Sequence, residues 1–354
     1  MKILHSADWH LDSPIVGHNP QQQAFLKEEM LRIPGKIANL CRREGCDLVL
    51  LAGDLFDGNY TRDSYQAVYQ ALEEMAVPVF ITPGNHDFVS LTSPWSRERW
   101  PENVHIFTQQ TITMVEAAGC RIFGAGFDAM EAPAMLKGFT APEGEGYAIG
   151  ILHGDTTQAK SQYCPITKKQ ITDCGLDYLA LGHIHKGDQL HAGKTLCAWP
   201  GCPMGHGYDE TGDKGVLIVE LGEEVTTRFV ALDTPRFYDL EVEPEEDALA
   251  AVGAVLPAVD SNDFYRITLV GPSEPVDLAA LQKEFGRFPN LVLRDRTVRP
   301  VDPWIAVGED SFEGMYFGLL QEKLSGADPE QQQIVELAAK LSRQLLDGRE
   351  VKLP

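Results

Sequence analysis

The sequence has no run of 18 or more apolar residues, the length that a membrane-spanning helix requires. Its N-terminal stretch also lacks the layout of a signal peptide, because an acid and two histidines interrupt it almost at once. From these two absences we expect a cytoplasmic protein without a membrane-bound part.

Cysteines are few, and none of them stands in a CxxC pair. The seven residues are Cys41, Cys46, Cys120, Cys164, Cys174, Cys197 and Cys202. An odd set with this spacing argues against a disulfide framework or a zinc ribbon. We therefore expect buried or incidental free thiols.

Positive charge is scarce: 30 Lys and Arg residues stand against 52 Asp and Glu residues, for a net charge of −22. The chain is acidic on both sides of Thr234. A protein that holds nucleic acid by itself normally presents a basic face that displaces phosphate counterions. Any nucleic-acid binding must therefore come from a local patch or from a partner.

The first two thirds of the chain alternate short apolar runs with helical stretches. Strands are expected at 3–7, 47–52, 77–82, 103–107, 111–116, 120–124, 147–152 and 176–181, and helices at 24–43 and 61–76. The first helix is expected to be disturbed at Pro34-Gly35. This pattern predicts an α/β domain whose sheets are covered by helices and whose ligands lie at the carboxyl ends of strands.

A predicted hairpin, formed by strands at 215–221 and 225–232, closes this main domain, for which we expect residues 1–235. The pattern then restarts with strands at 237–242, 264–270 and 291–297 and helices at 245–256 and 277–285, which predicts a small α+β domain at 236–300. A C-terminal segment, 301–354, carries an amphipathic helix at 328–346. Its apolar face would pack within the chain, dock to a partner or remain solvated.

Five short polar clusters each follow a predicted strand. They are Asp8-Trp9-His10, Gly53-Asp54-Leu55-Phe56-Asp57, Gly84-Asn85-His86-Asp87, His153-Gly154 and Gly182-His183-Ile184-His185. Each alone is explained as a turn, a helix cap or a satisfied histidine. Together they supply carboxylate, imidazole and amide oxygen, the donors that Mn²⁺, Fe²⁺ or Zn²⁺ accept. The set therefore predicts a divalent metal centre.

In order and spacing the five clusters resemble the signature of calcineurin-like metallophosphoesterases: D-x-H, G-D-x-x-D, G-N-H-D/E, a lone H and G-H-x-H. The resemblance implies a four-layer sandwich of sheets flanked by helices, with a small α+β capping domain after it. It also implies two divalent ions, with manganese as the first choice and iron, zinc or magnesium as alternatives. Asp8, His10, Asp54 and His185 would hold one ion, and Asp54, Asn85, His153 and His183 would hold the other, with Asp54 bridging.

The same resemblance makes His86 the catalytic histidine, which would stabilise the pentavalent phosphorus or protonate the leaving oxygen. A purely structural hydrogen bond is the alternative for His86. Asp57 and Asp87 would orient histidines or cap loops, since ligating imidazoles usually donate their second N–H to a carboxylate or a carbonyl. Some members of the family carry histidine where Asp57 stands here.

Three passages resemble the bacterial DNA repair exonucleases of the SbcD and YhaO type. They are the opening that runs from His5 to Pro14, the GDLFD form at Asp54, and the stretch from Trp199 through Glu210 to Val216, in which Cys202 replaces the usual serine. This resemblance implies an exonuclease or endonuclease that acts on DNA ends in repair or recombination, with DNA and an SMC-like coiled-coil ATPase of the SbcC type as partners.

Alternatives remain open from the sequence. The protein would otherwise be a phosphoesterase for a small nucleotide or another phosphodiester, with the C-terminal domain as a lid, or a scaffold that has lost activity. Arg294 and Arg296 would either touch DNA phosphates or be ordinary exposed arginines. The sequence is also compatible with a homodimer.

Overall fold

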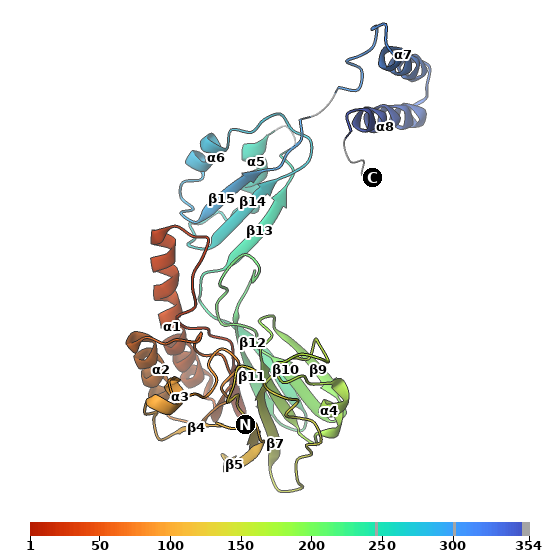
Figure 1. The fold of residues 1–354 in the computed structure, drawn as a ribbon. Helices are drawn as coiled ribbons and strands as arrows, with labels where there is room; N and C mark the ends of the chain where they lie inside the picture. The colour runs from red at the N-terminus through yellow and green to blue at the C-terminus, as the bar shows by residue number, and fades with distance from the viewer. Residues whose placement is uncertain (245–246, 300–301, 349–354) are drawn as a thin grey trace. The chain divides into compact units, whose positions relative to one another are not determined.

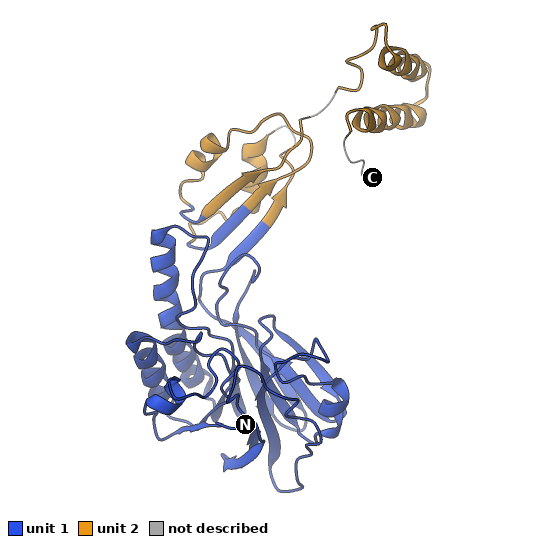
Figure 2. Ribbon diagram, in the orientation of Figure 1, with its two compact units in different colours: residues 1–239, 262–266, 288–290 blue, residues 240–261, 267–287, 291–354 orange. Residues whose placement is uncertain are grey.

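The computed structural model describes residues 1–244, 247–299 and 302–348 (Figure 1). The chain forms two compact units (Figure 2). The first comprises residues 1–239, 262–266 and 288–290, and the second comprises residues 240–261, 267–287 and the chain from Leu291 onward. The division at 235 and 300 remains a prediction, and residue 300 itself lies outside the described residues.

The first unit contains two six-stranded sheets. One has the order β12-β11-β1-β2-β3-β4, with β1 at Lys2–Ser6, β2 at Leu48–Leu51, β3 at Val79–Ile81, β4 at Val104–Ile106, β11 at Gly215–Leu221 and β12 at Val225–Ala231. The strands β1 to β4 run parallel, and β11 and β12 extend the sheet antiparallel.

The other sheet has the order β5-β6-β7-β8-β10-β9. Its strands are β5 at Thr113–Ala117, β6 at Cys120–Gly124, β7 at Tyr147–His153, β8 at Tyr178–Gly182, β9 at Asp188–Ala192 and β10 at Thr195–Trp199. The central strands β6, β7, β8 and β10 run parallel, and the edge strands β5 and β9 pair antiparallel with their neighbours.

Successive side chains of a strand point to opposite faces, so each sheet has two distinct faces. The two sheets pack together through one apolar face each. Ile3 and Leu50 of the first sheet share one buried cluster with Ile149 and Tyr178 of the second. The opposite face of the first sheet, represented by Val49, packs in a separate cluster with the helices. The predicted sandwich of sheets flanked by helices is thereby confirmed.

Helices α1 (Pro20–Glu44) and α2 (Arg62–Met75) pack against each other and against the first sheet. Contrary to our expectation, α1 continues without interruption through Pro34. A proline in a helix interior costs about 3 kcal/mol. The burial of Ile33 and Ile37, worth about 1.5–3 kcal/mol each, and the capping box of Asn19 offset that cost. Two short helices, α3 (Pro94–Arg97) and α4 (Lys168–Asp173), complete this unit.

A third sheet has the order β13-β14-β15, with β13 at Phe237–Val242, β14 at Phe264–Leu269 and β15 at Leu291–Asp295. Helices α5 (Ala248–Val255) and α6 (Leu278–Glu284) alternate with these strands, as the sequence predicts. Residues 245–246, at the predicted start of the first of these helices, lie outside the described residues.

Two further helices, α7 (Phe312–Ser325) and α8 (Pro329–Leu346), pack together around Ala306, Phe317 and Ala339. The sequence predicts α8, which the structure caps with Asp328, but misses α7. No helix in the described ranges is long and apolar enough to cross a membrane. All seven cysteines are unpaired and buried, as expected.

Candidate metal centre

The seven predicted ligands lie at the carboxyl ends of parallel strands from both sheets of the first unit. Asp8 and His10 follow β1, Asp54 follows β2, Asn85 follows β3, His153 ends β7, and His183 and His185 follow β8. Loops at this edge converge, which is why ligand sites form there in α/β sheets. The structure brings all seven side chains into one connected group.

The backbone of four of these residues is left-handed, a conformation that side chains other than glycine rarely adopt. The φ angle is 55° at Asp8, 45° at His10, 53° at Asp54 and 89° at His183. Such residues cost about 1–3 kcal/mol each and persist only when their surroundings enforce them. Here the amide of Asp8 donates to Gly53 O and that of His10 donates to Asp54 O, both at 3.0 Å. These bonds fix the directions of the side chains.

Two glycines allow the loops to approach closely. A Cβ atom on Gly84 would lie 2.2 Å from Asp54 Oδ1, and one on Gly182 would lie 2.0 Å from the carbonyl oxygen of Ala52. Any other residue at these positions would push the ligand-bearing loops apart.

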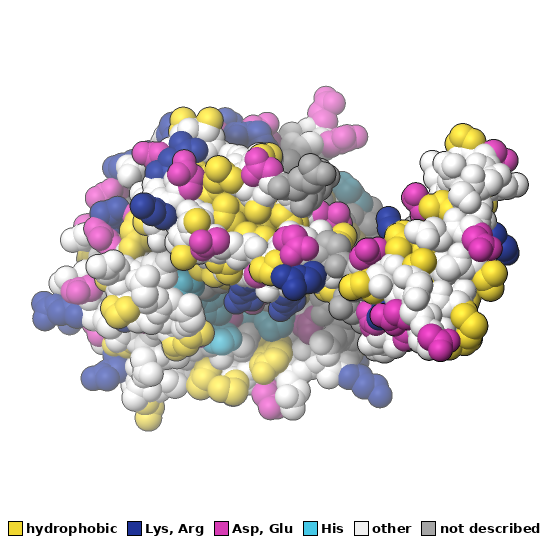
Figure 3. Space-filling view, turned by 90° about the horizontal axis from the view of Figure 1, so that it is seen from above, with side chains coloured by type: hydrophobic (Ala, Val, Ile, Leu, Met, Phe, Trp, Pro, Cys, Tyr) yellow, Lys and Arg dark blue, Asp and Glu magenta, His cyan; other side chains and the backbone are white. Residues whose placement is uncertain are grey.

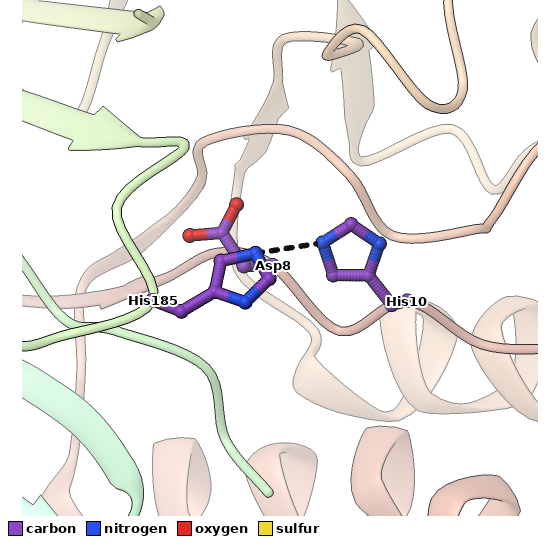
Figure 4. Close-up of side chains that lie close together, drawn as sticks. All are labelled: Asp8, His10 and His185. Atoms are coloured by element: carbon purple, nitrogen blue, oxygen red, sulfur yellow. Dashed lines mark hydrogen bonds between the residues drawn. The ribbon is translucent and has the colours of Figure 1, made fainter. Parts of the chain in front are cut away.

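The first group of donors consists of Asp8, His10 and His185 (Figure 4). The Nε2 atoms of His10 and His185 lie 3.0 Å apart. His185 bonds through Nδ1 to the carboxylate of Glu210, which assigns its proton to Nδ1 and leaves a lone pair on Nε2. The Nδ1 atom of His10 lies 3.6 Å from Asp57 Oδ1, so the carboxylate of Asp57 stands behind the ring of His10. With both Nε2 atoms deprotonated, their lone pairs would repel each other unless a cation lay between them.

The second group consists of Asp54, Asn85, His153 and His183. His153 donates from Nδ1 to the carbonyl oxygen of Ala52 at 2.9 Å, so Nε2 is the ring nitrogen that faces Asn85 Oδ1, at 3.0 Å. His183 Nδ1 lies 3.1 Å from the same amide oxygen. With these two ring nitrogens deprotonated, the imidazoles and the amide oxygen of Asn85 would offer three donor atoms to a cation.

Asp54 lies between the two groups. Its Oδ2 atom is 3.7 Å from His10 Nε2 and 3.2 Å from His153 Nε2. A carboxylate in this position can offer oxygen to both groups, which is the place that a bridging ligand would occupy.

The charges of the site also favour a cation. Burial alone would lower the pKa of His153, but Asp54 beside it raises that pKa to about 9. Burial would likewise raise the pKa of Asp54, yet His153 and His10 hold it below its ordinary value. Burial and the neighbouring His153 lower the pKa of His183 to about 4. Without a metal, the carboxylate thus holds a proton on His153, and a divalent ion would replace that positive charge.

His86 lies at the edge of the site, and 47% of its side chain is exposed. Its Nδ1 bonds to the carboxylate of Asp57, and this bond raises the pKa of His86. Its backbone amide donates to Asp54 Oδ1 at 2.9 Å, and its ring meets the ring of His10 edge to face at 4.7 Å. The exposed imidazole therefore stands beside both donor groups in a fixed orientation.

Asp87 contacts backbone rather than histidine. Its buried carboxylate accepts hydrogen bonds from the amides of Gly84 at 2.7 Å and Leu55 at 2.8 Å, and it thereby joins two ligand loops. Burial, and then the charge of Asp54, raise its pKa to about 7. Arg294 on β15 and Arg296 just after it are exposed in the second unit and do not belong to this group of side chains.

Sequence reasoning missed the roles of Glu210 and His206. One oxygen of Glu210 accepts from His185 Nδ1, and the other accepts from the amide of His206 at 2.8 Å and from its Nδ1 at 3.1 Å. The ring of His206 lies edge-on to that of His10 at 5.9 Å. The sequence singled out Glu210 only as part of the passage from Trp199 to Val216, and it did not predict which side chains Glu210 contacts.

The donor set fits two divalent ions: it has two carboxylates, one amide oxygen and four imidazoles, arranged as two groups that share Asp54. Together with the sandwich fold, these donors define a metal-dependent phosphoester hydrolase.

Residues 1–187 match the model of the calcineurin-like phosphoesterase family, and the chain belongs to this family. Over 259 residues it is 32% identical to the uncharacterized metallophosphoesterase YhaO of Bacillus subtilis, a match that covers 68% of this chain and 61% of that protein. It is 24% identical over 281 residues to the SbcD component of the SbcCD nuclease of the same organism, covering 66% and 70% of the two chains. It is 22% identical over 338 residues to the SbcD component of the SbcCD nuclease of Staphylococcus epidermidis, covering 84% and 86%. The chain thus spans about three fifths of the length of YhaO.

Proposed function

We propose that this protein is a two-metal phosphodiesterase that cleaves DNA and acts at DNA ends in repair or recombination. The observation that carries the proposal is the pair of donor groups around Asp54 with the exposed His86 beside them. The choice of DNA is supported by the similarity to two proteins named as components of the SbcCD nuclease.

In this proposal Asp8, His10, Asp54 and His185 hold one ion, and Asp54, Asn85, His153 and His183 hold the other, with manganese as the first candidate. When bound, two such ions polarise the phosphoryl oxygen and supply a hydroxide nucleophile near neutral pH. No nucleophilic side chain is needed.

His86 contributes the proton chemistry of the chain itself. Because Asp57 holds Nδ1, the Nε2 atom is the one that can reach a substrate. An imidazole in this position donates a hydrogen bond to a phosphoryl oxygen or a proton to the leaving oxygen. Asp57 fixes the ring and favours its charged form.

A comparison of two substrates tests the proposal. The purified protein with Mn²⁺ is given bis(p-nitrophenyl) phosphate, which requires only the metal centre, and linear duplex and single-stranded DNA at low salt. We expect all three to be hydrolysed. Turnover of bis(p-nitrophenyl) phosphate with intact DNA would overturn the nuclease assignment and favour a small phosphodiester as substrate.

We also infer a protein partner, an SMC-like coiled-coil ATPase of the SbcC type, at the helices α7 and α8. Large apolar side chains reach the surface of this helical pair, at right in Figure 3. Phe312 is 69% exposed, Ile334 is 61% exposed and Leu345 is 64% exposed. Co-expression with a coiled-coil ATPase of the SbcC type should give a complex, and Phe312→Asp with Leu345→Asp should dissociate it. A complex that survives both changes would contradict this docking site.

A further inference from the structure

A polar pocket of about 750 Å³ lies in the first unit beside the loops of the metal centre. Its walls include Gly58, Tyr60, Arg62, Tyr65, Arg97 and Glu98. A cavity of this size falls in the range that binds small ligands or single building blocks of larger ones.

The pocket is continuous with the backbone that carries the catalytic candidate. Gly58 directly follows Asp57, whose carboxylate holds His86. The amide of Gly58 donates to the carbonyl oxygen of His86 at 3.0 Å, and the amide of Asn59 donates to that of Asp57 at 2.9 Å. One wall of the pocket, Gly58, is thus bonded directly to the backbone of His86.

Two cations line the pocket in a chain that is otherwise strongly acidic. Arg62 and Arg97 are both exposed, and neither forms an ion pair with a carboxylate in the described part of the chain. Arg62 is the first residue of α2, after the cap Thr61. A positive side chain is unfavourable at that end of a helix, because the helix dipole is positive there. Helix stability therefore does not account for Arg62, and its charge is available to an anion.

Two aromatic rings in the pocket are held by their hydroxyl groups. Tyr60 donates to Glu98 Oε1 at 2.7 Å, and Tyr65 donates to the carbonyl oxygen of Arg99 at 2.7 Å. The ring of Tyr60 also packs edge to face against Phe56 at 5.9 Å. Rings fixed in this way suit the stacking of a base, which tolerates any base because each has a π face.

We propose that this pocket binds the nucleotide next to the scissile phosphate of a single nucleic-acid strand. The phosphate of that nucleotide lies against Arg62 and Arg97, and its base lies against the tyrosine rings. This inference rests on the proposed nuclease function, and it supplies the local basic patch that an acidic nuclease requires.

The double variant Arg62→Gln/Arg97→Gln tests the inference in the Mn²⁺-loaded protein. Its kcat/KM is measured for a single-stranded DNA oligonucleotide and for bis(p-nitrophenyl) phosphate, and each is compared with the wild-type value. We expect kcat/KM for DNA, divided by kcat/KM for bis(p-nitrophenyl) phosphate, to fall about tenfold or more relative to the wild type. The fall should come mainly from a higher KM for DNA. The slope of log kcat/KM for DNA against log salt concentration should become less negative by about 1.4, which is about 0.7 for each lost phosphate contact.

Arg43→Gln is the matched control, because it removes the same charge from another exposed arginine. Arg43 lies in the last turn of α1, at the amino end of β2 and away from the loops that follow the carboxyl ends. We expect it to behave as wild type. Both Arg62 and Arg97 are exposed, so the melting temperature of the double variant should stay close to the wild-type value.

Three outcomes would overturn the inference. An unchanged ratio would show that the arginines do not contact the strand, and an equal loss on both substrates would show that they act on the metal centre instead. If the wild type hydrolyses bis(p-nitrophenyl) phosphate but no oligonucleotide, the proposed function fails first and the pocket assignment fails with it.

Discussion

Replacing Glu210 with glutamine tests whether His185 needs a carboxylate partner to bind a cation. In the structure one carboxylate serves two imidazoles: one oxygen accepts from His185 and the other accepts from His206. Glutamine has nearly the same shape but only one acceptor oxygen. Its amide nitrogen must therefore face either His185 or the donors of His206, and one of the two contacts is lost.

The size of the effect follows from the burial and charge of Glu210. Only 14% of its side chain is exposed, so solvent screens the contact weakly. Burial would raise its pKa, but hydrogen bonds from His185 and His206 hold it well below the ordinary value, and the group is charged at neutral pH. Loss of a carboxylate behind a ligating histidine weakens metal binding about 10- to 100-fold, or about 1.4–2.7 kcal/mol.

Calorimetric titration of metal-stripped protein with Mn²⁺ measures this effect. We expect one of two Kd values to rise about 10- to 100-fold, the other to change little, and kcat on bis(p-nitrophenyl) phosphate to recover when Mn²⁺ is saturating. The control Glu220→Gln removes a carboxylate whose side chain is 55% exposed on β11, and it should change neither Kd. Unchanged affinities in Glu210→Gln, or equal weakening at both sites, would refute the orienting role.

Three further changes follow from the same geometry. His86→Ala should reduce turnover about 100-fold or more while the metal content measured by mass spectrometry stays intact, and unchanged turnover would refute its role. Burial lowers the pKa of His5 from 6.5 to about 3, so between these pH values only the unfolded chain takes up this proton, and the free energy of unfolding falls as the pH falls. His5→Gln should remove about 2 kcal/mol of the loss between pH 7 and pH 5, measured by urea unfolding. An unchanged pH dependence would contradict this. Gly182→Ala should destabilise the fold by about 1–3 kcal/mol in the same assay, because its Cβ would lie 2.0 Å from the carbonyl oxygen of Ala52. The control Gly326→Ala, whose Cβ would have no atom within 4 Å, should not destabilise it. Equal stability of the two variants would argue against this packing.

The sequence predicts the strands that carry the ligands because they are short, apolar and followed by polar loops. It misses β9, since that strand is largely exposed and has no apolar run. It misses α7 because the apolar residues of that helix are spread around its surface, with Phe312, Met315 and Leu319 exposed. Both elements are defined by their neighbours in the fold: β9 by pairing with β10, and α7 by packing on α8.

In the site, too, local patterns are visible in the sequence, whereas contacts between distant segments are not. Motif spacing singles out the seven donor residues, but it contains no information about left-handed backbone at Asp8 or His183, which depends on bonds between loops. The contact of Glu210 with His185 joins residues 25 positions apart and is likewise invisible in any local pattern. The continuity of α1 through Pro34 was unpredictable for a related reason, because packing against the sheet outweighs the local preference.

The acidity of the chain and the proposed DNA substrate are compatible because charge acts over a limited distance in salt. At physiological ionic strength the Debye length is about 8 Å, so acids farther from the pocket than this are largely screened. In the proposed complex, the divalent ions, Arg62 and Arg97 would then provide the local attraction for a strand. At about 0.01 M salt the Debye length grows to about 30 Å, and the net charge of −22 begins to repel the substrate. Lowering the salt should therefore improve kcat/KM for DNA only down to a limit, unlike the steady gain of a protein with a basic face. A rise that continues linearly to the lowest salt would show that the basic surface is larger than these two arginines.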